Sequence, residues 1–161
     1  AGMISAPLRS RFGISERLDF YHDSDLQAIV MQNATFLGLQ IEDRSALLIA
    51  KSARGTPRIA KKLLRRVRDF AQVTNDNCAT HELVVQALDF LGIDEQGLSS
   101  VDRKILDIIN NKFAGGPVGL ETIAAMVGED KETIEDVYEP FLMRKGLLEK
   151  TSRGRKVPVI V

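Results

Sequence analysis

The sequence has 161 residues, 44% of them hydrophobic and 27% charged, and its 22 Lys and Arg residues balance its 22 Asp and Glu residues. This composition is typical of a soluble globular protein with one ordinary domain or two small ones, and its single cysteine, Cys78, excludes an internal disulfide framework. Because no apolar run reaches the roughly 18 residues of a membrane span and no signal-like leader opens the chain, we expect a cytoplasmic protein without membrane contact.

The first 23 residues show no helical periodicity. The opening stretch "AGMISAPLRSRFG" has no initiator methionine, and we interpret it as the interior of a larger element. Residues 14–21, "ISERLDFY", alternate apolar and polar side chains well enough to be predicted as a strand. Because a lone strand is only marginally stable, it needs partner strands that the rest of the chain does not obviously supply.

Four helical patterns follow. In each of them apolar residues recur with the 3.6-residue period of one helix face. Asp23 or Ser24 is predicted to cap the first helix. Because each helix must bury its apolar face against the others, the patterns predict a small four-helix domain over 24–94. The predicted helices cover about 24–37, 42–53, 57–70 and 80–91.

The third helix begins unusually. In "RGTPRIAKKLLRRVR", Thr56 is able to cap free backbone N–H groups and Pro57 suits the first helical position. Arg58 then places a cation at the positive end of the helix dipole, which costs about 0.3–1 kcal/mol unless an anion offsets it. That anion is either a ligand or an Asp or Glu side chain on a neighbouring element. We interpret the cationic run 61–68 as a solvated helix face, with subunit contact as the alternative.

The stretch "GIDEQGLSS" is predicted to be a linker because it combines two glycines, acidic residues and serines. Beyond it, the pattern of helix, helix–turn–helix and hairpin is the plan of a winged-helix domain, which we place at 97–161. Its predicted helices cover about 100–112, 119–127 and 131–145, and its hairpin surrounds "SRG" at 152–154.

Opposite charges occupy adjacent blocks of this second domain. Residues 129–139 hold six acidic side chains and one lysine, whereas 144–156 hold six basic side chains and one glutamate. The acidic helix would repel phosphate, so we do not expect its face to enter a major groove. The hairpin cations are predicted to follow a DNA backbone without reading bases, unless they form only a solvated hairpin. The candidate DNA contacts are Lys131, Lys150, Arg153, Arg155 and Lys156.

Residue patterns for catalysis are scarce. His22 and His81 lie far apart and have no Cys or carboxylate at metal-ligand spacing, so no metal site is predicted. Cys78 has no recognisable nucleophile context. The segment 115–122, "GGPVGLET", superficially resembles a phosphate loop, but Glu stands where such a loop needs Lys, so it is interpreted as a glycine turn.

Several longer motifs together resemble one family across essentially the whole chain. They are "PLRSRFG", "LDFY", "ARGTPRIAKKLLRRVRDFAQV", "GGPVGLETIAAMVGE", "TIEDVYEPFLMRKG" and "KTSRGRK". These segments are similar to the C-terminal half of the RuvB family, the bacterial Holliday-junction branch-migration motors of the AAA+ class. The resemblance implies a mainly α fold with three parts. These are a residual strand of the large ATPase domain within 1–23, a small AAA+ lid domain at 24–94 and a winged-helix head at 97–161.

The resemblance also implies a function. Such motors form hexameric rings on duplex DNA, use ATP with Mg²⁺, and are loaded onto four-way junctions by RuvA during recombination and repair. Pro57 and Arg58 match the family's second-sensor "GxPR" motif, and Tyr21 matches a nucleotide-contacting tyrosine. Arg11 matches the arginine finger that enters the neighbouring subunit's site, and Arg9 is the weaker candidate. The family's phosphate loop and Mg²⁺ motif do not occur within 1–161, so this chain alone is predicted not to hydrolyse ATP.

Each of these residues has a simpler interpretation. Arg11 would then be a solvated loop charge, and Tyr21 an aromatic ring packed between domains. A winged-helix transcription regulator with a helical dimerisation domain, or an adaptor without DNA affinity, would explain the architecture. The regulator leaves Arg58, Arg11 and the acidic helix unexplained and predicts discrimination between DNA sequences. The adaptor would follow if the acidic block dominates.

Overall fold

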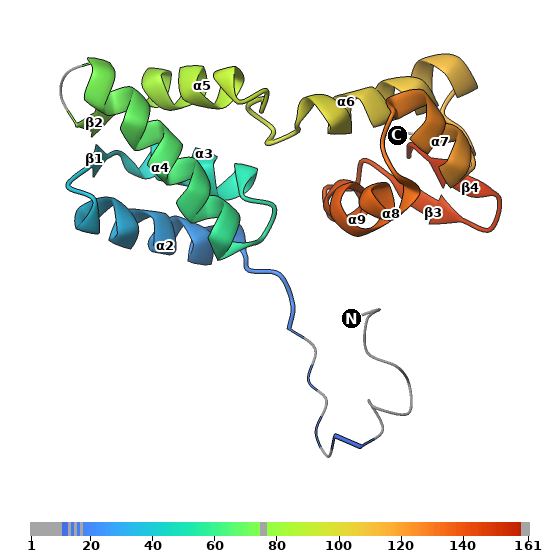
Figure 1. Ribbon diagram of the computed structural model, residues 1–161, viewed down its shortest axis with the longest axis horizontal. Helices are drawn as coiled ribbons and strands as arrows, with labels where there is room; N and C mark the ends of the chain where they lie inside the picture. The colour runs from blue at the N-terminus through green and yellow to red at the C-terminus, as the bar shows by residue number, and fades with distance from the viewer. Residues whose placement is uncertain (1–10, 13, 15, 17, 75–76, 159–161) are drawn as a thin grey trace.

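The computed structural model describes residues 11, 12, 14, 16, 18–74 and 77–158. Two helical lobes lie side by side, joined by a short segment along one edge (Figure 1). Each lobe has its own buried hydrophobic core. The predicted pair of units, a four-helix domain and a winged-helix domain, is therefore confirmed.

The first lobe packs four helices around a core of small and branched apolar residues. Leu26, Ile49 and Leu64 are fully buried at its centre, and alanines allow the helices to approach closely. His22, rather than the predicted Asp23 or Ser24, is the residue before the first helix, and its side chain makes no capping hydrogen bond. The helices are α2 (Asp23–Phe36), α3 (Asp43–Ser52), α4 (Pro57–Thr74) and α5 (His81–Phe90).

Two very short strands join the far ends of these helices. β1 (Gln40–Ile41) pairs in parallel with β2 (Cys78–Ala79), and Gln40 also donates its backbone N–H to the carbonyl of Asn77 at 2.8 Å. Strands of two residues carry no readable alternation, which explains why the sequence did not predict them.

The predicted strand over 14–21 is wrong for the described residues. None of residues 12, 14, 16 and 18–22 lies in a strand, and the side chain of Leu18 is 94% exposed. A strand needs a neighbouring strand to pair with. Tyr21 N–H donates to the carbonyl of Gly55 at 3.0 Å, but Gly55 lies in a turn.

The predicted linker is a packed connection. Asp94 accepts hydrogen bonds at Oδ1 from the backbone of Gln96 and Leu98, and Leu98 is buried. Gly97 has φ +80°, and a Cβ there would lie 2.9 Å from the carbonyl oxygen of Lys51. The chain is thus pressed against the first lobe before it enters the second.

The second lobe has three helical segments and a wing. Ile105, Ile123 and Leu142 are buried where the segments meet. In addition to the predicted hairpin, Val118 exchanges backbone hydrogen bonds with Arg155 at 2.7 and 2.8 Å, so the loop before the second segment lies against the wing. The elements are α6 (Ser100–Asp107), η1 (Ile108–Lys112), α7 (Leu120–Val127), α8 (Lys131–Thr133), η2 (Ile134–Tyr138), α9 (Glu139–Arg144), β3 (Glu149–Thr151) and β4 (Gly154–Lys156).

Candidate functional site

The turn before α4 fixes where Arg58 lies. Pro57 is the first helical residue, as predicted, because its φ suits that position and it has no N–H to satisfy. The Thr56 hydroxyl donates to the carbonyl of Ala53 at 3.0 Å, so its recorded bond runs backwards into the turn and is not the predicted cap. Arg58 follows as the second helical residue, with its side chain exposed.

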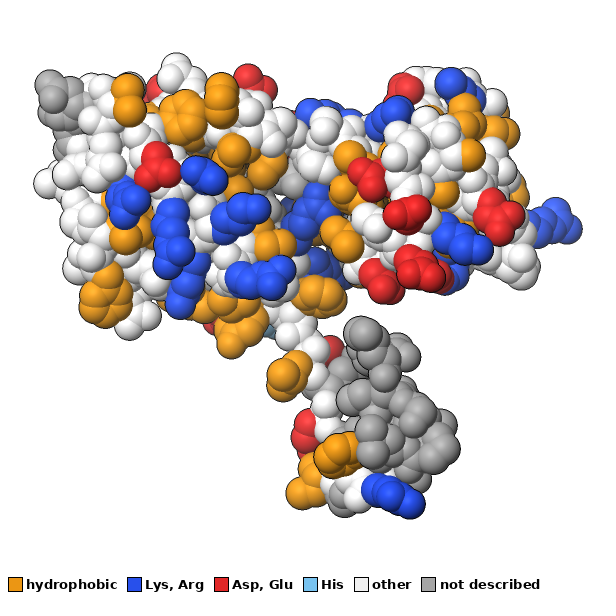
Figure 2. Space-filling view, in the orientation of Figure 1, with side chains coloured by type: hydrophobic (Ala, Val, Ile, Leu, Met, Phe, Trp, Pro, Cys, Tyr) orange, Lys and Arg blue, Asp and Glu red, His pale blue; other side chains and the backbone are white. Residues whose placement is uncertain are grey.

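Arg58 has no hydrogen-bonded or ion-paired partner in the described part of the chain. The interpretation in which a neighbouring carboxylate neutralises Arg58 therefore has no support among those residues. Further cations continue along the same helix, and Figure 2 shows Lys and Arg side chains in a row over the first lobe. A groove beside them is lined by Arg58, Lys61, Lys62, Arg65, Arg66, Arg68 and Asp69.

Tyr21 lies beside this turn. Its backbone N–H donates to Gly55, three residues before Arg58 in the chain. Its ring is half exposed and lines a cavity of about 270 Å³ together with Lys51, Phe141 and Arg144. The structure thus brings two predicted nucleotide contacts, Tyr21 and Arg58, to the two flanks of one turn.

Arg11 lies in an irregular, exposed part of the chain. It has no partner among the described residues, and Arg9 lies outside them. Within this single chain the structure does not bring Arg11 to Arg58. This is the arrangement that a residue acting on a neighbouring subunit would have.

Most of the candidate DNA contacts pair with nearby carboxylates on the surface. Lys131 lies 3.5 Å from Glu121, Lys150 lies 2.6 Å from Glu135, and Lys156 lies 2.8 Å from Glu149. Arg153, at the tip of the wing, is exposed and has no ion-pair partner in the described residues. Exposed pairs of this kind contribute about 0–1 kcal/mol, so a phosphate can replace the carboxylate at little cost.

Arg155 requires a correction. The sequence predicted it as one of the wing cations that follow a DNA backbone, but the residue is only 9% exposed. Its Nε donates to Oε1 of Glu139 at 2.5 Å and its Nη2 donates to Oε2 at 3.1 Å. Because strand residues alternate between the two faces of the hairpin, Arg155 faces α9 while the next residue, Lys156, has a side chain that is 43% exposed. Its first role is to hold the wing on the helix.

Several carboxylates of the acidic stretch 129–139 are exposed to solvent. Glu132, Glu135 and Asp136 lie on the surface of α8 and η2. The hydrogen bond and charge of Lys150 lower the pKa of the Glu135 carboxyl, with a smaller effect from Arg155. This surface is negative where a groove-reading helix would be positive or neutral.

Comparison with known proteins agrees with this geometry. Residues 21–94 match a family model described as the RuvB AAA lid domain, and residues 95–159 match the RuvB C-terminal winged helix domain. The chain belongs to the RuvB family. Its lid is the first lobe and its winged-helix domain is the second, and the alternative of a transcription regulator is not favoured because both models are RuvB models.

Solved structures of one relative give the same result. The structure described as the Thermotoga maritima RuvB Holliday junction branch migration motor is 45% identical, with a TM-score of 0.89. It matches over 98% of this chain and 53% of its own chain, so this RuvB-family chain spans about half of that relative. A lysine-to-arginine variant (45% identical, 98% and 52%) and an arginine-to-alanine variant (44%, 98% and 53%) of the same protein match with the same TM-score.

Sequence reasoning missed the junction between lid and winged-helix domain. Arg54 of the lid forms an ion pair with the fully buried Asp102 of α6, and Arg144 of α9 donates to the carbonyl of Arg54 at 2.7 Å. One signal was readable: "SSVD" is a capping box, in which Asp102 and Ser99 bond each other's backbone. That Arg54 of the lid reaches Asp102 in the other domain could not be predicted from the sequence.

The described residues contain neither a membrane-spanning helix nor a cluster of metal-ligating side chains. No described helix of this RuvB-family chain is long and apolar enough to cross a bilayer. Across 18–74 and 77–158 and the few described residues before them, no group of three or more His, Cys, Asp or Glu residues is placed to hold a metal ion.

Proposed function

We propose that this chain is the C-terminal part of an ATP-dependent DNA motor that drives Holliday-junction branch migration in recombination and repair in the cytoplasm. The lid completes a nucleotide site on a large ATPase domain, and the winged-helix domain grips duplex DNA without sequence preference. The observation that carries the proposal is that Arg58, at the start of α4, has no partner among the residues that the structure describes.

The electrostatics of α4 support a phosphate as the partner of Arg58. A cation in the first turn is unfavourable by about 0.3–1 kcal/mol, and no carboxylate in the described chain offsets it. A nucleotide phosphate would accept hydrogen bonds from the guanidinium and gain from the helix dipole at once. Pro57 fixes the start of the helix, and Tyr21 supplies an aromatic surface beside it.

Arg11 completes this site from a neighbouring subunit. We assign it as the arginine finger of a homohexameric ring, where it stabilises charge on the transferred phosphoryl group of ATP. Its exposure, and the lack of a partner for it among the described residues, support a role in trans. Because no phosphate loop occurs in 1–161, the isolated chain is expected to show no ATPase activity above background.

The winged-helix domain is proposed to hold duplex and four-way junction DNA through its wing. Lys150, Arg153 and Lys156 are exposed or partly exposed there, and Lys131 adds a cation beside α8. Arg155 contributes by fixing the wing, through Glu139, in the shape that presents the others. Contacts to phosphates alone suit a motor that moves along any sequence. RuvA is the proposed loading partner.

The experiment is ATP turnover by the full-length protein on a four-way junction in the presence of RuvA. Arg58→Ala should lower turnover at least tenfold, because a lost charge-assisted hydrogen bond to phosphate is worth about 1.5–3 kcal/mol. Arg65→Ala, on the same helix, is the matched control and should behave as wild type. Equal turnover by all three proteins would overturn the nucleotide-site assignment.

A further inference from the structure

Arg54, four positions before Arg58, is the lid residue whose side chain contacts the winged-helix domain. Arg54 has φ +54°, a left-handed conformation uncommon for a residue with a side chain. This backbone geometry directs its side chain out of the lid and into the winged-helix domain. There its guanidinium pairs with Asp102 and donates to Ser99 Oγ at 3.0 Å.

The environment of this ion pair is almost dry. The Asp102 side chain is fully buried and that of Arg54 is 15% exposed. The guanidinium carbon of Arg54 also lies 4.8 Å from the ring centre of Phe141 and 5.3 Å from that of Tyr138. Burial strengthens the contacts of the Arg54 guanidinium with the carboxylate and with the aromatic rings. Separating the two domains here would leave the buried Asp102 carboxylate without its partner, which is costly, so the contact holds the domains together at this point.

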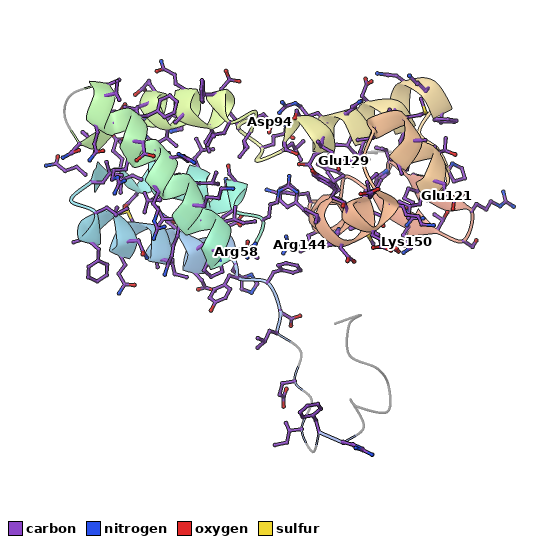
Figure 3. The ribbon with its side chains drawn as sticks, in the orientation of Figure 1. Arg58, Asp94, Glu121, Glu129, Arg144 and Lys150 are labelled. Atoms are coloured by element: carbon purple, nitrogen blue, oxygen red, sulfur yellow. The ribbon has the colours of Figure 1, made fainter. Side chains whose placement is uncertain are left out.

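A second arginine crosses in the opposite direction. Arg144, labelled in Figure 3 between the two lobes, donates to the carbonyl of Arg54 and lies 3.7 Å above the ring of Phe20. Gly55, with φ +75°, fits beneath it: a Cβ at that position would lie 2.5 Å from Nη1 of Arg144. Side chains of both domains therefore enclose the backbone of residues 54 and 55.

The backbone between Arg54 and Arg58 is held by hydrogen bonds. The backbone N–H of Thr56 and its hydroxyl both donate to the carbonyl of Ala53 at 3.0 Å, and the Thr56 carbonyl accepts from Ile59 at 3.1 Å. Pro57, whose φ is fixed, directly precedes Arg58. Only three residues, all in this hydrogen-bonded turn, thus separate Arg54 from Arg58.

We propose that Arg54 and Arg144 are positioning residues through which the winged-helix domain sets the position of Arg58, so that DNA held by the winged-helix domain and nucleotide held by the lid influence each other's affinity. This inference rests on the proposed function and adds to it the route of communication. By thermodynamic reciprocity, DNA must then change nucleotide affinity by the same factor as nucleotide changes DNA affinity.

The test measures the dissociation constant of a fluorescent ADP analogue for the full-length protein, with and without saturating 30-base-pair duplex. The ratio of the two values is the coupling. We expect a ratio of about fivefold or more, in either direction, for wild type. In Arg144→Met the ratio should fall to within twofold of unity, while duplex affinity without nucleotide stays within twofold of wild type. Arg144 is exposed, so this variant is expected to fold.

Lys145→Met is the matched control, because Lys145 neighbours Arg144 but contacts Phe141 of its own domain. It should keep the wild-type ratio. A wild-type ratio in Arg144→Met, an equal loss in Lys145→Met, or a wild-type ratio of one would each overturn the inference. Failure of the proposed function is seen separately, as unchanged ADP-analogue affinity and ATP turnover in Arg58→Ala.

Discussion

Arg155 of the wing and Glu139 of α9 are joined by two charge-assisted hydrogen bonds, at 2.5 and 3.1 Å, in a site where Glu139 is only 2% exposed. Buried pairs of this kind are costly to break from one side, because the remaining charge has no partner. The wing's position on the winged-helix domain therefore depends on this one contact more than on its surface ion pairs.

Glu139→Ala is expected to lower the free energy of unfolding by about 3–5 kcal/mol. It removes both hydrogen-bond acceptors of the buried Arg155 guanidinium and leaves it only the exposed Glu135 carboxylate, 3.7 Å away. Urea denaturation of the chain measures this. Glu132→Ala, which removes an exposed carboxylate nearby, should change the value by less than about 0.5 kcal/mol. Similar unfolding curves for the two variants would contradict the structural role of the pair.

Arg153→Ala is expected to weaken duplex binding by the same factor on every DNA sequence, because the wing is proposed to contact phosphates and not bases. The slope of log affinity against log salt should become shallower by about 0.9 for each lost phosphate contact, and the unfolding curve should not change. Fluorescence anisotropy at several salt concentrations gives both quantities. Loss of affinity on some sequences only would favour base readout instead.

Arg155→Ala serves as the comparison for Arg153→Ala. It should lose both stability and DNA affinity, because it releases the wing from α9. A variant that binds DNA weakly with an unchanged unfolding curve would show that Arg155 acts directly on DNA.

The surface pair of Lys150 and Glu135 makes a pH-dependent contribution. The hydrogen bond from Lys150 lowers the pKa of Glu135 below 4.5 in the folded chain. A lowered folded-state pKa means that the pair stabilises the fold above pH 4.5 and that this contribution is lost as pH falls through the folded pKa. Lys150→Met should raise the pKa of Glu135, as followed by NMR of its side-chain carbonyl carbon. An unchanged titration would show that the pair does not form in solution.

Arg11→Ala in the full-length protein is expected to reduce ATP turnover by about 10³–10⁵-fold, the range found for arginine fingers in other phosphoryl-transfer enzymes. Nucleotide affinity should change much less, because the finger acts on the transition state. Arg9→Ala is the matched control and should retain turnover. If Arg9→Ala lost activity and Arg11→Ala kept it, the finger would be assigned to the wrong arginine.

The helices of both domains were predictable because each repeats apolar residues with a clear period. Leu26, Ile49 and Leu64 meet at the centre of the lid, as their spacing requires. The strand predicted over 14–21 failed for a different reason: alternation describes a face that would be buried, and two residues of that face, Ile14 and Leu18, are 80% and 94% exposed. The two-residue strands β1 and β2 were too short to carry a pattern.

The count of charged residues along the sequence identified the basic wing, but it did not show toward which face each side chain points. Arg153 and Arg155 look alike in the sequence, yet one is exposed and the other is buried against Glu139. The ion pair of Arg54 with Asp102 joins residues 48 positions apart. Contacts of that kind depend on how two finished domains meet, and no local pattern encodes them.

The most direct test of the account is a structure of the full-length assembly with ADP bound. The account predicts that a guanidinium nitrogen of Arg58 lies at about 2.7–3.2 Å from a phosphate oxygen, with the turn at Arg54 still held by Asp102 and Arg144. An Arg58 side chain that points away from the nucleotide in every subunit would contradict it.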